Sequence, residues 1–286
     1  MSMGSYSILS KVNGWNINLD KVMGSGAWST VYPASRTTNK GDIEKAAVKV
    51  IDKTRLKAHE KQFAALEMDC LRRLEKTPGV LRFLDHFEDS IHHYIFMQLC
   101  PHGDLFEYLA DKGKLAGPTA RYIFAQLLTA VQGIHSQGIL HRDLKLENIL
   151  ITEITTAGPT VVICDFGLAT IVPSWDVKFE AWVGSPEYAS PELINKVPYS
   201  AEVDVWALGV ILYAMTVGKH PFSDDDVANI YHRIRVQPVY LPAIISDNLG
   251  DLITRMLDKN NASRIKLNEI TNHPFLKSRP SKRAHR

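Results

Sequence analysis

The pattern of apolar and polar residues changes about a third of the way along the chain. Up to Leu99, apolar residues gather in short runs rich in β-branched and aromatic side chains, separated by Gly, Asn or Asp, which is typical of strands joined by turns. From Phe63 to Leu74 they recur at helical spacing instead, and Thr77-Pro78-Gly79 ends that helix. The strands predicted here are Trp15–Met23, Thr30–Ser35, Lys45–Ile51, Val80–Glu88 and His93–Leu99.

After Leu99, apolar residues at intervals of three and four predict helices, with short strands only at Ile149–Ile151 and Val161–Ile163. A strand-rich part followed by a helix-rich part predicts an α+β fold with two lobes. The change in composition at residues 98–103 marks the predicted hinge between them. The helices predicted are Asp104–Lys112, Pro118–Gln137, Asp204–Val217, Asp225–Val236 and Asn248–Leu257.

Composition and charge exclude several classes of protein. With 286 residues, 45% of them apolar and 22% charged, the chain is neither disordered, nor collagen-like, nor a disulfide-stapled miniprotein. The net charge of +2 gives no reason to expect nucleic-acid binding, although residues 277–286 hold five basic side chains and no acid. This basic tail is either a localisation signal or a solvated terminus.

Cysteine usage and hydropathy predict where the protein resides. The three cysteines have no C-x-x-C spacing, which favours a reduced intracellular protein. The longest apolar run, residues 205–218, is shorter than the roughly 18 residues needed to span a bilayer. We therefore expect a cytoplasmic or nuclear protein without a transmembrane segment.

Two features of the strand-rich part suggest chemistry. The stretch Gly24-Ser25-Gly26-Ala27-Trp28-Ser29 lies between predicted strands, and it is either an ordinary hairpin turn or a loop whose backbone N–H groups approach phosphate oxygens. It is neither a Rossmann loop nor a Walker loop. Lys49 interrupts an apolar strand, so its charge either reaches solvent or needs an anion, which Glu67 on the following helix can supply.

The most specific segment is His-Arg-Asp-Leu-Lys-Leu-Glu-Asn at residues 141–148, followed by Asp165-Phe166-Gly167. Each polar residue at a strand end could be a turn former. Together, two aspartates and an asparagine near strand ends are hard oxygen ligands, suited to magnesium bound with phosphates.

With these motifs, residues 15–276 resemble the eukaryotic protein kinase family. The resemblance implies a bilobal kinase fold, with a small strand-rich N-lobe at about 15–99 holding one key helix, and a larger helical C-lobe at about 104–276. Residues 1–14 would be an N-terminal extension and 277–286 a basic tail. The resemblance continues through Gly184–Tyr188 and Ser190–Glu192, and it implies structural anchors at Glu192, Arg264 and Asp204.

The resemblance also implies ATP and Mg²⁺ as cofactors and assigns roles to individual residues. Lys49 would hold the α- and β-phosphates, with Glu67 fixing it. Asp143 would accept the hydroxyl proton, while Lys145 steadies the γ-phosphate. The metal ligands would be Asn148 and Asp165, and the remaining nucleotide contacts would come from Gly24, Ser25, Gly26, Val31, Ala47, Met97, Gln98, Cys100, Asp104, Leu150 and Asp165.

The type of kinase and its substrates follow from the same resemblance. Lys145 and the Gly184–Tyr188 segment are the serine/threonine form, similar to the calcium/calmodulin-dependent and related stress- and energy-sensing kinases. Protein substrates with Ser or Thr acceptors are the implied partners of a monomeric catalytic domain. Glu107 and Glu147 either bind a basic residue before the acceptor or are solvated surface acids, and Ser185 is predicted to lie in the substrate-binding segment.

The activation segment departs from the family pattern. Ala181 stands where many relatives have a phosphorylatable threonine, so Arg142 lacks its usual phosphate partner. We predict that Glu180 or Asp176 pairs with Arg142 instead and that the domain needs no phosphorylation here. Trp182 either contacts a peptide substrate or packs beneath the loop, and packing is the favoured prediction.

Two alternatives remain to be weighed. A catalytically weak or pseudokinase scaffold would lack one of four residues that this chain retains: Lys49, Asp143, Asn148 and Asp165. A small-molecule kinase would not need the peptide-binding segments that include Gly184–Tyr188.

Overall fold

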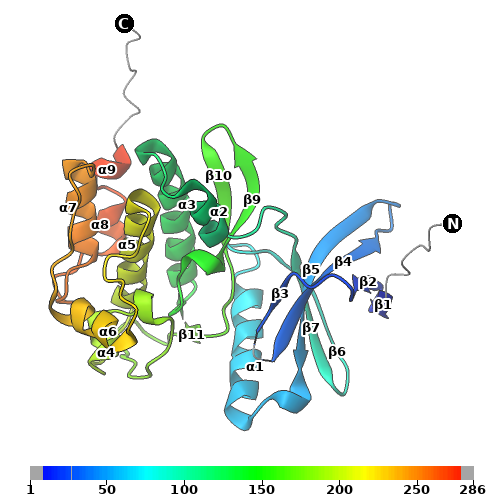
Figure 1. The fold of residues 1–286 in the computed structure, drawn as a ribbon. Helices are drawn as coiled ribbons and strands as arrows, with labels where there is room; N and C mark the ends of the chain where they lie inside the picture. Colours follow the sequence, from blue (N-terminus) through cyan, green and yellow to red (C-terminus); the bar gives the residue numbers. More distant parts are fainter. Residues whose placement is uncertain (1–8, 27, 278–286) are drawn as a thin grey trace, which may run out of the picture. The chain divides into compact units, whose positions relative to one another are not determined.

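The computed structural model describes residues 9–26 and 28–277, which divide into two compact units (Figure 1). The N-terminal unit comprises residues up to 76 and residues 81–101, and the C-terminal unit comprises residues 77–80 and those from 102 onward. The predicted N-terminal extension is described only from Leu9 and the basic tail only at Lys277, while Ala27 of the glycine-rich stretch lies outside the described residues.

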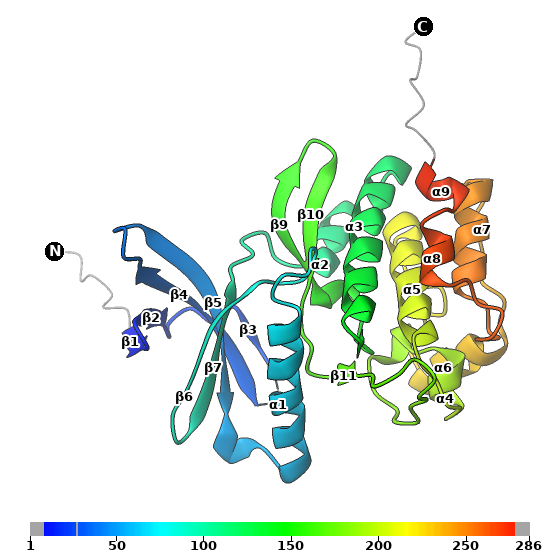
Figure 2. The same ribbon diagram turned by 180° about the vertical axis from the view of Figure 1, so that it is seen from behind.

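The N-terminal unit is one antiparallel sheet of order β1-β2-β4-β5-β7-β6, with β3 paired to β4. Helix α1 lies beside this sheet in both ribbon views (Figures 1 and 2). The sequence did not predict β1, which adds a strand inside the expected extension. The elements are β1 (Leu9–Val12), β2 (Trp15–Asn18), β3 (Gly24–Ser25), β4 (Ser29–Thr37), β5 (Ile43–Asp52), the 3-10 helix η1 (Lys53–Arg55), α1 (Ala58–Arg73), β6 (Phe83–Glu88) and β7 (His92–Gln98).

One face of this sheet forms a hydrophobic core. Because side chains alternate between the faces of a strand, Ala46 and Val48 of β5 point to the same side, and they cluster with Phe96 of β7. The Trp15 ring stacks on Phe96 with centroids 4.8 Å apart, and the Arg36 guanidinium lies 4.3 Å above the indole. This core leaves the opposite face of β5 for Lys49.

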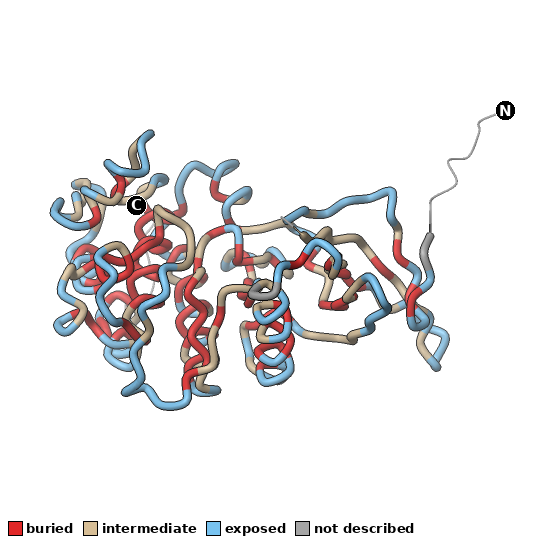
Figure 3. Tube along the Cα trace, turned by 90° about the horizontal axis from the view of Figure 1, so that it is seen from below, coloured by how far each residue is buried: buried red, intermediate tan, exposed pale blue. Residues whose placement is uncertain are grey.

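The C-terminal unit is built from helices around a buried centre. Helix α5 is buried from Val203 to Thr216, which explains the apolar run 205–218 as a core helix. Buried segments, red in Figure 3, run along the central helices of this unit. No helix within the described residues is both long and apolar enough to cross a membrane. The helices are α2 (Leu105–Lys112), α3 (Gly117–Ser136), α4 (Pro191–Ile194), α5 (Glu202–Val217), α6 (Val227–Val236), α7 (Asp247–Met256), α8 (Leu267–Ile270) and α9 (Pro274–Lys277).

Short strands and turns of the same unit hold the polar motifs. Strands β9 and β10 form an antiparallel hairpin, and β8 pairs with β11. Gln126 of α3 fixes the hairpin, because its Oε1 accepts the Val161 N–H at 3.0 Å and its Nε2 donates to the Pro159 carbonyl at 3.1 Å. These elements are β8 (Ile139–Leu140), the 3-10 helix η2 (Leu146–Asn148), β9 (Ile149–Thr155), β10 (Gly158–Ile163), β11 (Thr170–Ile171) and the 3-10 helix η3 (Pro186–Tyr188).

Residues 77–80 belong to the C-terminal unit, although the sequence placed them in the N-lobe. The Ile163 N–H donates to the Gly79 carbonyl at 2.8 Å, and Val80 forms an isolated parallel bridge with Ile163. Gly79 has φ of +76°, and a Cβ there would lie 2.7 Å from the Ala130 Cβ. The predicted strand Val80–Glu88 therefore begins only at Phe83, because Val80 pairs with Ile163 inside the C-terminal unit.

Candidate active site

The N-terminal unit gathers five of the predicted nucleotide residues on one sheet face. Gly24 pairs with Val31, and Val31 pairs with Lys49 on the next strand. Two residues before Lys49, Ala47 pairs with Met97. Directly paired residues share a face, as do residues two apart on a strand, so all five lie on the same side.

The ammonium group of Lys49 is paired on that face. Its Nζ donates to the Glu67 Oε1 at 2.6 Å, although the two residues lie on different elements, β5 and α1. Both side chains are largely buried, and a buried charge needs a partner of opposite sign. The structure therefore brings together the lysine and glutamate that the sequence paired.

The other predicted nucleotide residues of this unit lie in turns and at strand ends. The Gly26 N–H donates to the Ser29 carbonyl at 2.8 Å and closes the turn between β3 and β4, while Ser25 ends β3. The Gln98 N–H donates to the Arg82 carbonyl at 2.9 Å. Burial raises the pKa of Cys100 to about 12, so its thiol is protonated and unreactive at neutral pH.

In the C-terminal unit, three predicted residues converge on the carboxylate of a fourth, Asp143. Lys145 Nζ lies 3.1 Å from Asp143 Oδ2 and donates to Ser185 Oγ at 3.1 Å. The Ser185 hydroxyl donates to Asp143 Oδ1 at 3.0 Å. Asn148 Nδ2 donates to the Asp143 carbonyl at 2.9 Å and to Oδ2 at 3.2 Å. Asp143 is therefore oriented by groups from both the catalytic loop and the segment before η3.

A buried aspartate holds the backbone of this loop. Asp204, in the first turn of α5, accepts the N–H groups of His141 and Arg142 at 3.0 Å each and contacts the His135 ring at 2.7 Å. Burial alone would raise the pKa of Asp204, but the His135 hydrogen bond, the nearby imidazoles and the His141 N–H keep it lowered. Arg142 has φ of +66°, and the bond to Asp204 holds this unfavourable backbone in place.

The hairpin of β9 and β10 places two oxygen donors together. Ile149 pairs with Ile163, so the flanking Asn148 and Cys164 are adjacent, and the Cys164 N–H donates to the Asn148 carbonyl at 2.9 Å. Asp165 follows directly with φ of +60° and is exposed. Amide and carboxylate oxygens at one hairpin end fit a magnesium ion, which prefers hard oxygen ligands.

This pair does not by itself complete a metal centre. No cluster of three or more His, Cys, Asp or Glu side chains suited to a metal occurs among the described residues. Magnesium in proteins is commonly held by one or two carboxylates together with substrate phosphates and water. Asn148 and Asp165 therefore fit a cation that arrives with a nucleotide.

The predicted ribose residue also has a structural role. Asp104 Oδ1 accepts the Glu107 N–H at 2.8 Å and so caps helix α2. Asp104 forms an isolated bridge with Leu150, and the Ile151 N–H donates to the Gly103 carbonyl at 2.9 Å. Asp104 and Leu150, both assigned to the nucleotide, are thus neighbours.

Sequence reasoning missed a histidine near the predicted substrate segment. His220 Nε2 lies 3.0 Å from the Tyr188 hydroxyl, and its Nδ1 lies 3.5 Å from Glu187 Oε1. Burial, followed by the charge of Glu147, raises the pKa of Tyr188, whose hydroxyl accepts the Leu146 N–H at 3.3 Å. A lone histidine before a proline offered no pattern from which this contact could be read.

Arg142 is held by backbone carbonyls and aromatic side chains. Its Nε donates to the Leu168 carbonyl at 2.8 Å and its Nη2 to the Ala169 carbonyl at 3.4 Å. Its Nη1 donates to the Tyr199 hydroxyl at 3.5 Å, and the guanidinium lies 5.8 Å from the Phe179 ring centroid. The guanidinium therefore has hydrogen-bond partners within the chain and does not need a phosphate to supply them.

Two predictions for the activation segment do not hold. Neither Glu180 nor Asp176 forms an ion pair with the catalytic-loop arginine in the described part of the chain; Asp176 instead accepts the Ser174 hydroxyl at 3.3 Å. Trp182 does not pack beneath the loop, because it is 44% exposed and meets Tyr231 edge-on, with ring centroids 6.4 Å apart.

Comparison with known proteins agrees with this arrangement. The sequence pattern of the protein kinase domain matches residues 17–276, nearly the whole chain. The chain belongs to the protein kinase family. In this kinase, the four residues whose loss would indicate a pseudokinase are all present: Lys49, Asp143, Asn148 and Asp165. The family uses ATP together with Mg²⁺.

Curated relatives place the kinase in the serine/threonine class. It is 38% identical over 260 residues to the mitosis inducer protein kinase cdr1 of Schizosaccharomyces pombe, covering 90% of this chain and 41% of that protein. It is 34% identical over 257 residues to the serine/threonine-protein kinase PLK4 of Xenopus laevis, covering 89% of this chain and 26% of that protein. With the SNF1-related protein kinase catalytic subunit alpha KIN12 of Arabidopsis thaliana the identity is 32% over 260 residues, covering 91% and 51%. The chain thus spans about half or less of the length of these relatives.

Proposed function

We propose that this kinase phosphorylates serine and threonine hydroxyls of protein substrates through Asp143. The observation that supports this role is the hydrogen bond from the Ser185 hydroxyl to Asp143 Oδ1 at 3.0 Å. A serine hydroxyl within the chain already donates to this carboxylate, which is the contact that a substrate hydroxyl must make with a general base. Lys145 next to the same carboxylate supplies compensating positive charge.

The proposed reaction moves one proton and one phosphoryl group. The substrate oxygen forms a bond to the γ-phosphorus of ATP, the bond to the ADP oxygen breaks, and the hydroxyl proton passes to Asp143. Lys145 steadies the transferred group, and Lys49, oriented by Glu67, holds the α- and β-phosphates. Bound through Asn148 and Asp165, magnesium would offset the charge of the phosphates.

The Asp143→Asn variant tests the chemical role. We expect kcat to fall about 10²- to 10⁴-fold, because the amide cannot take up the proton, while nucleotide affinity stays unchanged. Kinetics with a generic serine peptide and binding of a fluorescent ATP analogue give the two values. Asp111→Asn, an exposed change on α2, is the matched control. An Asp143→Asn enzyme with more than about a tenth of wild-type kcat contradicts the role, since a general base contributes more than that.

We further propose that activity does not require phosphorylation of the activation segment. The support is the position of Arg142, whose guanidinium is bound by two carbonyls and the Tyr199 hydroxyl, with Ala181 at the usual phosphorylation position. The Ala181 carbonyl accepts the Tyr199 hydroxyl at 2.7 Å, so Tyr199 links the arginine to this segment. A hydrogen-bonded guanidinium gains less from an added phosphate than an unpaired one.

Phosphatase treatment tests this mode of activation. Purified kinase treated with lambda phosphatase should retain its kcat, whereas Tyr199→Phe, which removes the link, should lower kcat several-fold at unchanged ATP affinity. Mass spectrometry verifies that the segment is free of phosphate. Loss of activity that returns on phosphorylation near Ser174 or Thr170 would refute the proposal.

A preference for one basic residue before the acceptor is our third proposal. Its support is Glu147, an exposed acid one residue before Asn148 in the catalytic loop. Glu107, the other acid predicted for this role, is exposed on α2. In a positional peptide library we expect Arg to be favoured about three- to tenfold at one site only, and Glu147→Gln to remove that preference. A wild-type profile without a preference for Arg at any position contradicts the proposed substrate preference and leaves the two other proposals unaffected.

A further inference from the structure

An open pocket of about 450 Å³ lies in the N-terminal unit, among residues to which no catalytic or nucleotide role has been assigned. Three segments form it: η1 with the turn after it, the first turn of α1, and the turn between β6 and β7 with the start of β7. Only one of its side chains is apolar. The lining residues are Lys53, Thr54, Leu56, Lys61, Ser90 and His93.

The chain is strongly basic where it borders this pocket. Residues 53–61 contain Lys53, Arg55, Lys57 and Lys61 against one acid, Glu60. Glu60 is engaged locally, because its carboxylate accepts the Lys57 N–H at 2.6 Å. Within the described residues the exposed Lys61 ammonium has no ion-pair partner. A cluster of positive charges on one surface attracts anions.

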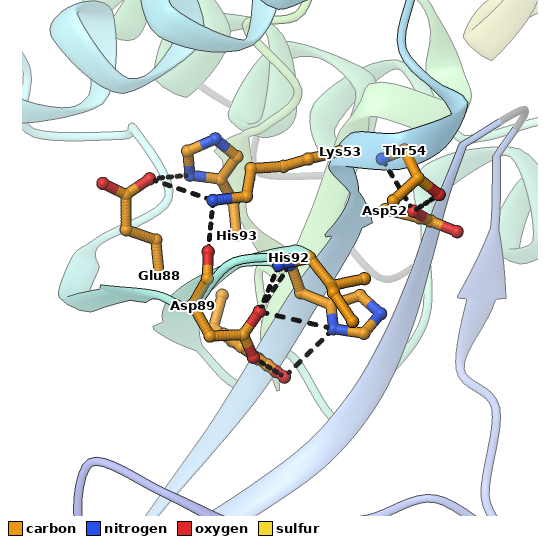
Figure 4. Close-up of polar contacts among 9 residues, drawn as sticks. Asp52, Lys53, Thr54, Glu88, Asp89, His92 and His93 are labelled. Carbon is orange, nitrogen blue, oxygen red and sulfur yellow. Dashed lines mark hydrogen bonds and ion pairs between the residues drawn. The ribbon is translucent and has the colours of Figure 1, made fainter.

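An oxyanion already contacts the edge of the pocket. The Glu88 carboxylate lies 3.6 Å from Lys53 Nζ and 3.2 Å from His93 Nδ1, and Lys53 also donates to the Asp89 carbonyl (Figure 4). Glu88 is 56% exposed, so this contact is at the rim and open to exchange with another anion. Lys53 is therefore placed to meet an oxygen-bearing charge, whereas burial lowers the pKa of His93 and its Nδ1 forms no hydrogen bond within the described part of the chain.

The second acid of the turn is directed elsewhere. The Asp89 carboxylate accepts the N–H groups of Ile91 and His92 at 2.7 Å each and the Tyr94 hydroxyl at 3.0 Å (Figure 4). These bonds lower the pKa of Asp89 to about 2, and the N–H groups of His92 and Ile91 have the largest effect. Asp89 thus stabilises the turn that presents Ser90 and does not line the pocket.

We infer that this pocket binds a phosphomonoester, with Lys53 and Lys61 as cations and the hydroxyl of Ser90 as a donor. A phosphomonoester bears close to two negative charges at neutral pH and accepts several hydrogen bonds, which matches two lysines and neighbouring hydroxyls better than a carboxylate does. The volume lies in the range of ligand sites, so the group that bears the phosphate enters as well. The source is either a phosphorylated side chain of a polypeptide or a free phosphomonoester.

Direct binding measurements on the whole chain test the inference independently of kinase activity. Inorganic phosphate, O-phosphoserine and the peptide acetyl-Gly-Ala-phosphoserine-Ala-Gly-amide are titrated separately, with affinity read by calorimetry and ³¹P line broadening. The unphosphorylated peptide is the ligand control. We expect a saturable single site for O-phosphoserine whose affinity falls as salt rises from ~50 to ~500 mM, because screening weakens charge pairing.

A pair of matched variants localises the site. Lys61→Gln removes a cation of the pocket, while Lys45→Gln removes another exposed lysine, from β5 outside it. We expect Lys61→Gln to weaken binding about fivefold and Lys45→Gln to leave it unchanged. Both lysines are exposed, and thermal unfolding checks that each variant folds.

The ligands separate the possible sources, and two results overturn the inference. A phosphopeptide that binds tighter than O-phosphoserine supports a polypeptide source, whereas equal affinities support a free phosphomonoester. No saturable binding of any phosphorylated ligand overturns the site. Equal effects of Lys61→Gln and Lys45→Gln also overturn it, since they indicate general attraction of anions to the surface.

Discussion

A half-buried lysine in the C-terminal unit, whose ammonium nitrogen is shielded from solvent, makes the stability of the kinase depend on pH. The Lys259 ammonium nitrogen lies 3.7 Å from the Phe222 ring centroid and 5.0 Å from that of Trp206, and it has no hydrogen-bond partner among the described residues. Burial, with a smaller effect from the Arg264 charge, lowers the pKa of Lys259 from 10.5 to about 7. We predict that Lys259→Met stabilises the fold.

The size of the effect follows from proton linkage. Between pH 7 and about 10 the unfolded chain holds a proton on this amine that the folded chain lacks, so the free energy of unfolding rises with pH. The free energy of unfolding rises by ~1.4 kcal/mol per pH unit over this range. Burying the amine therefore costs at most ~4 kcal/mol near pH 7. Contact of the cation with the two rings returns about 0.5–2 kcal/mol. We therefore expect Lys259→Met to add roughly 1–3 kcal/mol at pH 7.

Urea unfolding of wild type and Lys259→Met at several pH values between about 6.5 and 9.5 measures this difference. The gain should be largest at the acidic end and shrink as pH rises, because wild type recovers stability there. Lys219→Met, at an exposed lysine of the same unit, is the control and should change little. A Lys259→Met protein that is less stable than wild type throughout, or whose gain is independent of pH, refutes the reasoning.

Three other changes have defined outcomes. Arg264→Met should cost about 3–5 kcal/mol in urea unfolding, because it leaves Glu192, bonded at 2.6 and 2.9 Å and almost fully buried, without its partner; a loss below about 1 kcal/mol contradicts this. Gly79→Ala combines a positive φ with a clash, whereas Gly113→Ala has a similar φ of +73° in open space, so the first should cost at least about 1 kcal/mol more than the second. Cys100, with its pKa raised to about 12 by burial, should react with iodoacetamide at pH 8 only after unfolding, and rapid labelling of the native kinase would show the burial to be wrong.

The elements that sequence periodicity predicted well are those whose burial is continuous. Helix α3 was expected at Pro118–Gln137 and spans Gly117–Ser136, since one apolar stripe faces the core along its whole length. The four-residue helix α4 is shorter than the spacing on which a periodicity rests, and the two-residue strands β8 and β11 are formed by pairing across distant parts of the chain. Such elements depend on tertiary contacts that a local pattern does not contain.

The candidate site also contains contacts that the sequence could predict and contacts that it could not. Lys49 and Glu67 could be paired from the sequence, because a charged residue in an apolar strand requires a counter-charge and the following helix carries one. The partners of Arg142 could not, because Tyr199 is 57 residues away and the other partners are backbone carbonyls, which every residue has. The nearest acids in sequence were chosen for Arg142 instead, and sequence proximity proved a poor guide.

The bonds from Asp204 to the catalytic loop have a consequence for how the kinase loses activity. The amide protons of His141 and Arg142 are bonded to a side chain that is 1% exposed and rooted in the central helix α5. Their exchange with solvent deuterium then requires opening of that helix, so they belong to the slowest-exchanging class of the unit. Asp143 follows these two amides directly, and its geometry is therefore lost in the same cooperative transition as the core rather than by local fraying.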